Sequence, residues 1–340
     1  MTATDASFAK RFLTGKRFST GVCLTLGLLA GLAMASDRAE AQSWPNKPII
    51  FVVPFAAGGG TDAFARPLAA QLDGQLGQRV LIENKPGAGG TIGASHASKA
   101  DPDGYTFFIG GAHHAIAPSL YKLDYDLEKD FIPVAMIARP PQVLVVHPKK
   151  VTAKTVAELL DYARANPDKL SYASAGAGTT HHLAGELFKT MTKTRILHVP
   201  YRGAGPAMQD LLAGHVDMEF DGLGSSASQI KNGNLRALAI AAPKRVPTFP
   251  DVPTAAEAGL PGYEVATWYA VFAPKNTPAD IIERMRKELR TALQTQTIKD
   301  AWERNGSDVP EMEGKEFATF VNSEIARWGK VVKDAGVKAE

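Results

Sequence analysis

The chain has 340 residues, with 38 lysines and arginines against 35 aspartates and glutamates, and a formal net charge of +3. This near-neutral balance excludes the strongly basic surface by which proteins bind nucleic acid or an anionic membrane. The single cysteine, Cys23, excludes an internal disulfide and a cysteine-rich zinc site. We therefore expect no nucleic-acid partner and a chain that is stabilised by its apolar core.

The first 41 residues have the features of a secretory signal peptide. Four basic residues within 10–17 precede an apolar run over 21–34, and residues 39–41 (Ala-Glu-Ala) supply an A-x-A cleavage pattern. The run is shorter than the roughly 20 residues that a membrane span needs. Cleavage after Ala35 is the alternative. We predict that residues 1–41 are removed during export, which leaves 299 residues with a net charge near +1.

Strand and helix patterns alternate along the rest of the chain. The strand patterns fall at 49–54, 79–83, 105–109, 132–137, 142–147, 170–174, 195–199, 216–221, 235–241 and 265–273. The helix patterns fall at 61–76, 90–99, 155–165, 179–191, 204–213, 225–231, 254–259, 278–295, 297–304 and 314–335. Alternation of this kind predicts an α/β fold with mostly parallel sheets flanked by helices.

The first strand pattern leads into a glycine turn and a helix start. Residues 51–66 read FVVPFAAGGGTDAFAR, so three glycines separate Phe55 from the helix that is expected to begin at Thr61. A helix N-terminus offers unpaired N–H groups and a partial positive charge, and glycines let a ligand approach the backbone closely. This turn is therefore predicted to hold an anion without a charged side chain.

Two later turns repeat this arrangement. Residues 172–180 (YASAGAGTT) and 199–206 (VPYRGAGP) again place glycines between a strand pattern and a helix pattern. The first and second copies are separated by about 120 residues, which approaches the size of a domain. Two anion-ready turns on two lobes predict a ligand that is held between the lobes by hinge closure.

Five segments carry a resemblance to a known family. They read WPNKPIIFVVPFAAGGGTDAFAR, VLIENKPGAGGTIGASHASKADPDGYTF, SAGAGTTHHLAGELFK, HVPYRGAGPAMQDLLAGHVDMEFD and FPDVPTAAEAGLPGYE. In this order they resemble the Bug/TctC family, the periplasmic solute-binding proteins of tripartite tricarboxylate transporters. The resemblance implies a two-lobed periplasmic-binding-protein (Venus flytrap) fold that closes on a small organic carboxylate. It also implies the transporter's membrane subunits as partners, and we expect a monomer without a cofactor.

The resemblance further implies which residues hold the ligand. In this family, main-chain N–H groups and waters at two turns bind the carboxylate oxygens. The implied positions are Phe55, Ala56, Gly58, Gly59, Thr61 and Asp62 on the first lobe, and Ser174, Gly176, Gly178, Thr179 and His181 on the second. The family commonly has Pro-Ala-Gly-Gly-Pro-Thr-Asp after the phenylalanine. This chain lacks both prolines, which predicts a looser loop.

Four side chains have two interpretations each. Asp62 is either a helix-start carboxylate or a group that orients the N–H groups of the loop. His113 follows the third strand pattern, where it could reach the ligand or be a satisfied loop histidine. Asp221 could accept a hydrogen bond from a ligand hydroxyl or amine, or be a turn residue. Tyr201 could flank an aromatic ligand together with Phe55, although aromatic residues are more often part of the core.

The main alternative is an exported enzyme that binds a nucleotide or phosphate at the first turn. Gly58, Gly60 and Ala63 fit G-x-G-x-x-A, and Glu83 follows at the spacing of a dinucleotide fingerprint. Two facts weaken this interpretation: the turn is longer than that motif, and export separates the chain from cytoplasmic cofactors. A binding protein that signals to a membrane kinase is a third class.

Metal binding and catalysis have little support in the sequence. The histidine pairs at 113–114 and 181–182 do not supply the three or four converging ligands of a zinc site, and Glu186 adds only a second ligand to the later pair. There is no G-x-S-x-G motif, and Ser174 is close to His181 in sequence without assured contact. We therefore predict no metal and no enzymatic activity.

The strand patterns at 142–147 and 265–273 bracket the middle of the chain. Both are apolar segments rather than glycine- and serine-rich linkers. We predict domain one over residues 43–143 plus 266–340 and domain two over residues 144–265. Two such crossovers would form a hinge of limited travel.

Overall fold

The computed structural model describes residues 44–338 except residue 264. The predicted signal peptide, residues 1–41, lies outside these described residues. Residues from Lys47 to Glu340 form one compact unit, and the fold described below lies within it. Among the described residues, no helix is both long enough and apolar enough to cross a membrane.

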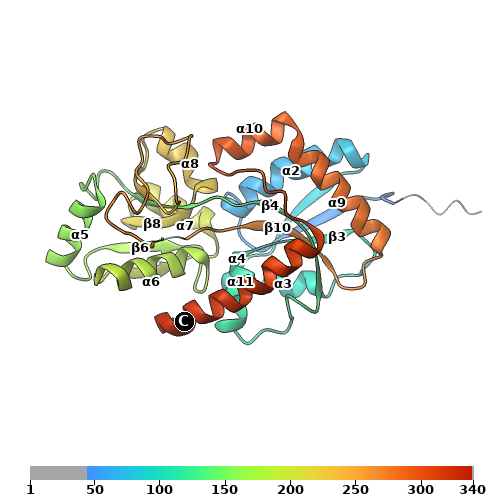
Figure 1. The fold of residues 1–340 in the computed structure, drawn as a ribbon, viewed down its shortest axis with the longest axis horizontal. Helices are drawn as coiled ribbons and strands as arrows, with labels where there is room; N and C mark the ends of the chain where they lie inside the picture. Colours follow the sequence, from blue (N-terminus) through green and yellow to red (C-terminus); the bar gives the residue numbers. More distant parts are fainter. Residues whose placement is uncertain (1–43, 264, 339–340) are drawn as a thin grey trace, which may run out of the picture. The chain divides into compact units, whose positions relative to one another are not determined.

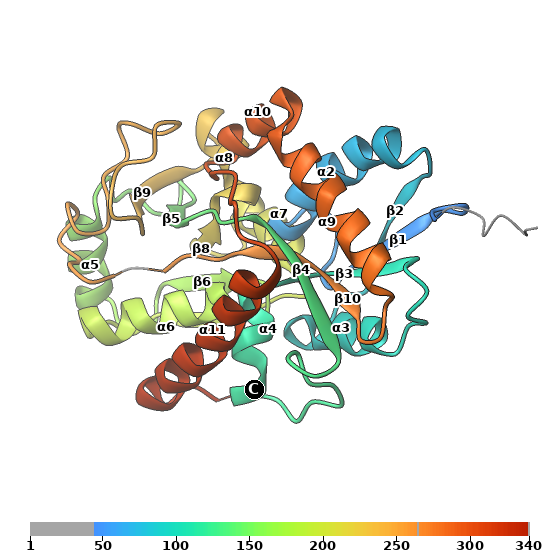
Figure 2. The same ribbon diagram turned by 45° about the vertical axis from the view of Figure 1, so that its right-hand side comes forward.

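One sheet carries the first glycine turn. Its five strands run in the order β2-β1-β3-β10-β4. All five are labelled in Figure 2, which turns the view of Figure 1 by 45°. They are β1 (Ile49–Val53), β2 (Val80–Asn84), β3 (Thr106–Gly111), β4 (Phe131–Ala138) and β10 (Tyr269–Pro274). β1 pairs in parallel with β2 and β3, whereas β10 is antiparallel to β3 and β4. This sheet therefore combines strands from the beginning and the end of the chain.

Six α-helices accompany this sheet in sequence. They are α2 (Gly60–Leu76), α3 (Thr91–Ser98), α4 (Ala112–Ile116), α9 (Ala279–Gln294), α10 (Gln296–Arg304) and α11 (Gly314–Ala335), with 3-10 turns at Ala88–Gly90 and Ala117–Ser119. In α2, Phe64, Leu68 and Leu72 recur every four residues and are fully buried, which is the spacing of a helix with one apolar face. α2 ends at Gly77, whose φ of 66° is the left-handed conformation that favours glycine.

The second sheet contains the strands from the middle of the chain. Its order is β7-β6-β8-β5-β9. The strands are β5 (Gln142–Val146), β6 (Ser171–Ser174), β7 (Leu197–Pro200), β8 (Met218–Gly222) and β9 (Arg236–Ile240), and the helices are α5 (Val156–Ala165), α6 (Thr180–Thr192), α7 (Ala204–Ala213) and α8 (Leu223–Lys231). β6 is parallel to β7 and β8, and β5 is antiparallel to β8 and β9. In Figure 2 the labelled strands of this sheet (β5, β6, β8 and β9) lie to the left of the strands of the first sheet.

The α/β class is confirmed, and the pairing within each sheet is mixed rather than mostly parallel. The antiparallel strands have a common cause, because β5 and β10 are the strands that the chain enters when it crosses from one sheet to the other. A strand reached by such a crossover is not the product of a βαβ unit, which is the connection that enforces parallel pairing.

Two predicted elements differ from the structure. Residues 254–259 form turns rather than a helix. Glu257 and Thr254 cap each other's N–H groups as in a helix start, but Gly259 has a φ of +90° and Pro261 follows, so only one turn forms. The strand expected at 265–273 begins only at Tyr269, because the preceding segment is the crossover. The sequence analysis did not predict helix α4.

The two crossover segments are hydrogen-bonded to each other. Gln142 N–H donates to the Val265 carbonyl (3.2 Å), and Thr267 N–H donates to the Pro140 carbonyl (3.3 Å). The assignment of residues 43–143 plus 266–340 to one domain and 144–265 to the other stays a prediction. Any hinge motion between the sheets would have to bend these two hydrogen-bonded segments together.

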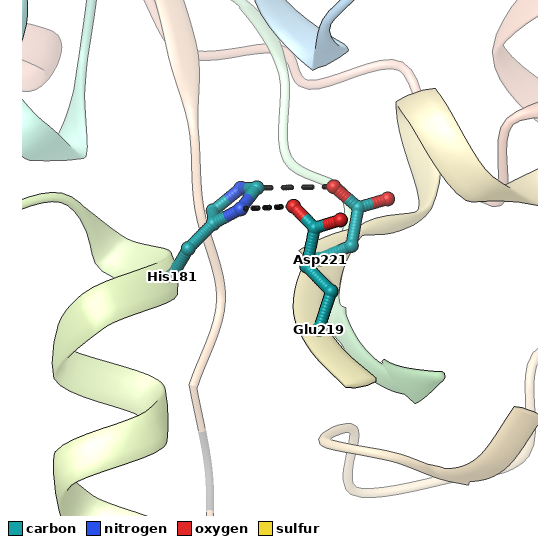
Figure 3. A group of neighbouring side chains, drawn as sticks. All are labelled: His181, Glu219 and Asp221. Atoms are coloured by element: carbon teal, nitrogen blue, oxygen red, sulfur yellow. Dashed lines mark hydrogen bonds and ion pairs between the residues drawn. The ribbon is translucent and has the colours of Figure 1, made fainter. Parts of the chain in front are cut away.

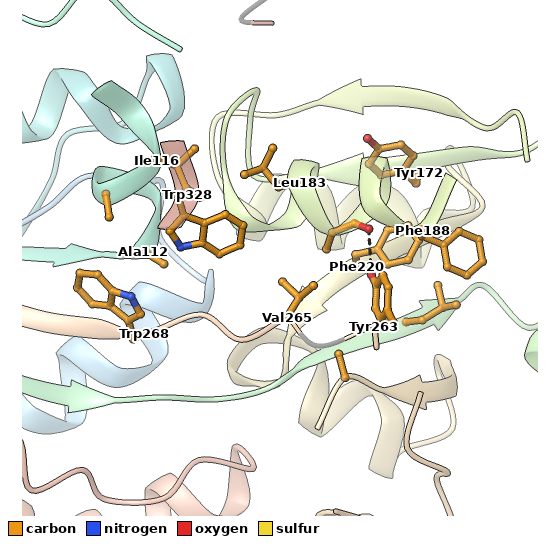
Figure 4. Close-up of a cluster of buried hydrophobic side chains, with 14 of the residues drawn as sticks. Ala112, Ile116, Tyr172, Leu183, Phe188, Phe220, Tyr263, Val265, Trp268 and Trp328 are labelled. Carbon is orange, nitrogen blue, oxygen red and sulfur yellow. Dashed lines mark hydrogen bonds between the residues drawn. The ribbon is translucent and has the colours of Figure 1, made fainter. Parts of the chain in front are cut away.

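The apolar core continues from one sheet to the other. Figure 4 shows Trp268 and Trp328 in the same buried cluster as Leu183 of α6 and Phe220 of β8. The indole N–H groups of Trp268 and Trp328 both donate to Glu324, at 3.0 and 3.1 Å. This buried contact ties α11 to the crossover that leads into β10.

Candidate ligand-binding site

The first turn leads into α2, and its N-cap residue has no side chain that could cap the helix. Gly59 is the N-cap residue, with φ −88° and ψ 177°, and among the described residues no side chain caps the helix from this position. The N–H groups of Gly60, Thr61 and Asp62 have no acceptor within the helix, because the first turn of any α-helix lacks one. All three residues are buried. These donors and the positive end of the helix dipole favour an anion here.

Asp62 organises the loop. Its carboxylate accepts hydrogen bonds from the Gly58 N–H (3.0 Å), Arg66 Nε (2.7 Å) and Asn84 Nδ2 (3.3 Å). The amide of Asn84 also donates to the Phe55 carbonyl (2.8 Å), so the end of β2 holds the turn from the other side. The Gly58 N–H is thereby engaged inside the turn. Of the two interpretations of Asp62, the geometry favours loop organisation.

The second turn, between β6 and α6, is closed by its own hydrogen bonds. The Gly176 N–H donates to Ser174 Oγ (3.1 Å), and the Gly178 N–H donates to His182 Nδ1 (3.1 Å). Gly178 has a φ of +72° and Gly176 a φ of +129°, which L side chains rarely adopt. These two predicted ligand donors are therefore engaged within the turn.

Thr179 is the N-cap of α6. Its hydroxyl donates to the Gly176 carbonyl (2.7 Å) and accepts from the His182 N–H (3.5 Å). By helix geometry the N–H groups of Thr180 and His181 remain without an intrahelical acceptor. The second anion-ready point is therefore the start of α6 rather than the glycines before it.

Ser174 pairs with His198 rather than with His181. Its Oγ lies 2.7 Å from His198 Nε2, and the serine is fully buried. The His198 ring stacks on His182 at 4.1 Å and on Tyr172 at 4.9 Å between ring centroids. Burial lowers the pKa of His198 to about 4, so the ring is neutral at pH 7. Ser174 is thus part of a packed aromatic stack.

The first turn packs against the third turn. The Ala56 N–H donates to the Arg202 carbonyl (3.3 Å). A β-carbon at Gly205 would lie 2.2 Å from the Ala57 carbonyl oxygen, and one at Gly59 would lie 3.2 Å from the β-carbon of Ala204. Glycine at these positions lets the two backbones approach. The first sheet and the N-terminus of α7 are therefore in direct backbone contact.

The second turn packs against a loop of the first sheet. The Tyr121 hydroxyl donates to the Ala177 carbonyl (2.7 Å). A β-carbon at Gly89 would lie 2.7 Å from the same carbonyl oxygen. The predicted turns on both sheets are thus placed at the contact between the sheets.

A cluster of three buried ionisable side chains lies beside these turns. His181 projects from α6 toward Glu219 and Asp221 of β8 (Figure 3). His181 Nδ1 is 3.2 Å from Glu219 Oε1, and Nε2 is 3.7 Å from Asp221 Oδ1. The exposed fraction is 3% for His181 and 0% for both carboxylates. Asp221 also accepts a hydrogen bond from Ser225 Oγ (2.6 Å).

Burial dominates the ionisation of this cluster. It raises the pKa of Glu219 well above its ordinary value. It also raises the pKa of Asp221 to about 7, with a further contribution from the charge of Glu219 and an opposing one from His181. Burial lowers the pKa of His181, although Asp221 opposes this. Among the described residues, His181 is the only basic side chain that forms an ion pair with either carboxylate.

Tyr269 connects the cluster to the first turn. A β-carbon at Gly60 would lie 2.5 Å from the Tyr269 hydroxyl oxygen and 3.9 Å from Ser225 Oγ. Burial raises the pKa of Tyr269, and the charge of Asp221 adds to this effect. The start of α2 therefore lies within a few ångströms of the polar groups of β8 and α8.

The adjacent histidines of α4 have different environments. His114 accepts a hydrogen bond from the Gly111 N–H at Nδ1 (3.0 Å), and its Nε2 lies 3.4 Å from the Gly90 carbonyl oxygen. His113 is 4% exposed, and neither ring nitrogen has a hydrogen-bond partner among the described residues. The His113 ring meets Phe55 edge-on, with 4.8 Å between centroids. Among the described residues, only the His114 ring of this pair is hydrogen-bonded, so the interpretation of His113 as a satisfied loop histidine finds no support in these contacts.

Tyr201 does not bring its hydroxyl to this cluster. The hydroxyl donates to Asp210 Oδ2 (2.7 Å) on α7. The sequence analysis missed Glu219, which belongs to the cluster, and also Ser225 and Tyr269, which lie next to it. Glu219 had a detectable signal, because a carboxylate stands between Met218 and Phe220 in an apolar strand pattern.

An open groove on the second sheet lies elsewhere. It is lined by the start of α5, by β9 and by residues 251–258, and none of the predicted site residues lines it.

Comparison with known proteins decides the family. The sequence model of the "Tripartite tricarboxylate transporter family receptor", TctC, matches residues 64–337. The chain belongs to this family. The resemblance found in the five segments is thereby confirmed, and TctC proteins are solute-binding receptors rather than a family of enzymes.

Curated relatives of this TctC protein match over nearly their whole length. A "UPF0065 protein in tcbD-tcbE intergenic region" from Pseudomonas sp. strain P51 is 40% identical over 319 residues, covering 92% of this chain and 95% of the relative. Protein BugT from Bordetella pertussis is 35% identical and covers 94% of this chain and 98% of its own.

Solved structures of similar proteins confirm the two-lobed fold. Periplasmic binding protein BugD has a TM-score of 0.84 with 36% identity, covering 87% of this chain and 100% of its own. An R. palustris protein with adipate has the same TM-score and coverage with 39% identity. MatC from Rhodopseudomonas palustris, with bound malate, has a TM-score of 0.81 with 37% identity, covering 85% and 100% of the two chains.

Proposed function

We propose that this TctC-family protein is an exported, periplasmic binding protein that captures a small organic carboxylate between its two lobes. It delivers the ligand to the membrane subunits of a tripartite tricarboxylate-type transporter and does not transform it. The observation that carries this proposal is the uncapped start of α2. Its buried N–H groups at Gly60, Thr61 and Asp62 form an anion site at the contact between the two sheets.

The ligand carboxylate is proposed to lie on these three N–H groups. Phe55, Ala56, Gly58 and Gly59 shape the turn around it, and the side chain of Asp62 fixes the turn while only its N–H group contacts the ligand. The start of α6 approaches from the second lobe, with Ser174, Gly176, Gly178 and Thr179 holding its geometry. His113, His181 and Asp221 face the remainder of the ligand, and Tyr201 supports α7 behind it. Adipate and malate in the similar proteins support a carboxylate of this size.

The proposed lobes follow the two sheets. Residues 43–143 plus 266–340 form the first lobe and residues 144–265 the second. The strands of each sheet fall within these ranges except for the first two residues of β5, Gln142 and Val143, which supports this division. The paired crossovers at Gln142 and Thr267 would allow the lobes to close around a ligand with limited travel. A monomer is sufficient for this mechanism.

A ligand screen tests the proposed function. The chain without residues 1–41 is screened by thermal shift against mono-, di- and tricarboxylates, amino acids and aromatic acids, and hits are measured by calorimetry. We expect at least one carboxylate to bind with one equivalent and to be recovered unchanged. Turnover of a hit, or binding of nucleotides and phosphate with no carboxylate hit, would instead support the exported enzyme.

A further inference from the structure

The His181, Glu219 and Asp221 cluster has the ligand types of a metal site. Glu219 and Asp221 are two residues apart on β8, so both side chains point to the same face of the sheet. His181 reaches them from the first turn of α6 (Figure 3). One ligand atom from each of the three residues can be chosen so that all lie within 4.8 Å of one another. The chain thus brings one nitrogen and two oxygen ligands together from two elements.

The two edges of the His181 ring make different contacts. The 3.2 Å distance from Nδ1 to Glu219 Oε1 is a hydrogen bond. The 3.7 Å distance from Nε2 to Asp221 Oδ1 is too long for one. It does suit an ion held by both atoms, because zinc bonds to nitrogen and carboxylate oxygen are each about 2.0–2.2 Å. A histidine that donates one N–H to a carboxylate and binds metal through the other nitrogen is the common arrangement at metal sites.

Several buried polar atoms around the cluster lack hydrogen-bond partners among the described residues. They are Glu219 Oε2, Asp221 Oδ2 and both ring nitrogens of His113. The two carboxylate oxygens belong to the cluster itself, so each could bind an ion without breaking a hydrogen bond.

The two carboxyl groups also lack a permanent cation. Neither has a lysine or arginine partner among the described residues, so burial disfavours their charged forms. A divalent cation would replace their protons, stabilise the charged forms and use the unpartnered oxygens.

We propose that His181, Glu219 and Asp221 bind a divalent transition-metal ion, for which Zn²⁺ fits the donor set. Imidazole ligands favour Zn²⁺ and related ions over Mg²⁺ and Ca²⁺, which prefer oxygen ligands alone. The proposed function places His181 and Asp221 beside the carboxylate ligand, so the metal proposal deepens that site and rests on it, and the two kinds of binding are measured separately.

Metal titration tests the proposal directly. The chain without residues 1–41 is stripped with a chelator, exchanged into chelator-free buffer at pH 7.5 and titrated with Zn²⁺ alone by calorimetry. We expect one ion per chain with micromolar affinity or better. Co²⁺ provides a second readout, since a low-symmetry nitrogen and oxygen site gives it visible absorption. The variants His181→Ala and Asp221→Asn should each bind at least 100-fold more weakly.

A surface histidine provides the matched control. His215 also pairs with a carboxylate, with Nδ1 3.2 Å from Asp210 Oδ1, but its side chain is exposed. His215→Ala should bind Zn²⁺ like the wild type. If His215→Ala loses the ion and His181→Ala keeps it, binding is a surface effect and the proposal is wrong.

Folding of the variants is controlled separately. Asp221→Asn preserves side-chain shape and removes a buried charge, so without metal it should melt no lower than the wild type. Glu219→Gln is the second isosteric variant and should also weaken binding. Failure of the wild type to bind a stoichiometric ion overturns the metal proposal and leaves the carboxylate screen unaffected. Conversely, a protein that binds Zn²⁺ but no carboxylate retains the metal site and loses the proposed function.

Discussion

Asp62 and Asp221 are both buried carboxylates beside the glycine turns, and their partners differ. Asp62 accepts hydrogen bonds from Gly58, Arg66 and Asn84. Asp221 has one close donor, Ser225, and one oxygen without a partner among the described residues. A buried charge that is fully hydrogen-bonded supports structure, whereas an uncompensated one is costly unless a ligand uses it. These partners assign Asp62 to the scaffold, whereas Asp221 is the residue for which we propose a binding role.

Replacing Asp62 tests its role in the loop. Asp62→Ala should lower the free energy of unfolding by about 1–3 kcal/mol, because it removes the buried carboxylate that accepts hydrogen bonds from the Gly58 N–H, Arg66 and Asn84. Arg66→Ala removes only a half-exposed partner of the same carboxylate and should cost less than about 1 kcal/mol. Urea denaturation of both variants measures the difference. Equal losses would mean that the ion pair, rather than the loop hydrogen bond, is what Asp62 contributes.

The stability of Asp221→Asn relative to the wild type should depend on pH. Burial raises the pKa of Asp221 to about 7 from an ordinary 3.8, so between these values the folded wild type binds more protons than the unfolded chain. The wild type therefore loses stability from this group as pH rises through that window. The variant lacks the loss, so its advantage should grow by roughly 2–4 kcal/mol between pH 4 and 7 and then level off.

This pH dependence is measured as a difference between the two proteins, with a chelator present. The buried His113 and His181 have lowered pKa values and give slopes of the opposite sign. Both proteins contain them, and only the wild type has the Asp221 charge that partly opposes the lowering of the His181 pKa. Glu219, Ser225 and Tyr269 also face Asp221 and are unchanged in the variant. A constant stability difference from pH 5 to 8 would mean that Asp221 is ionised in the fold at an ordinary pKa.

At the scale of elements, the glycine turns set how closely the two sheets approach. Gly205 lies at the start of α7, where a β-carbon would come within 2.2 Å of the Ala57 carbonyl oxygen. This atom is backbone, so the turn or the helix has to move. The contact also includes the hydrogen bond from Ala56 to Arg202. The first turn can therefore reach its observed position only while residue 205 is glycine.

Gly205→Ala should weaken binding of a carboxylate found in the screen at least tenfold, about 1.4 kcal/mol. Gly74→Ala is the matched control, because Gly74 is also helical and a β-carbon there meets nothing within 4 Å. Both changes gain about 1 kcal/mol of helix propensity, so only the contact differs. Calorimetry on the two variants gives the comparison. If Gly205→Ala binds the carboxylate with unchanged affinity, the close packing of the first turn against α7 is not required for ligand binding.

The sequence predicted the elements better than their contacts. Periodicity located the helix carrying Phe64, Leu68 and Leu72, because a local pattern determines which face is buried. Residues 254–259 were mistaken for a helix, since a capped single turn has the same local signals as a helix start. The approach of His181 to Glu219 and Asp221 was not predictable, because the residues are about 40 positions apart and no spacing rule links a helix start to a neighbouring strand.

At the scale of the molecule, the two lobes are joined by crossovers that are hydrogen-bonded to each other. The backbone bonds of Gln142 and Thr267 restrict independent motion of the two segments. The contacts between Ala56 and Arg202 and between Tyr121 and Ala177 bring the lobes together on the side of the turns. Opening of the proposed hinge would have to break these contacts, so we expect ligand binding to favour the closed arrangement.

Small-angle scattering with and without ligand tests the central claim most directly. The chain without residues 1–41 is measured alone and at saturation with a carboxylate whose affinity calorimetry has established. Closure excludes water from the anion site and strengthens its hydrogen bonds, so the ligand favours the closed form. We predict a smaller radius of gyration with ligand than without. An unchanged scattering curve at verified saturation would contradict capture of the ligand between two closing lobes.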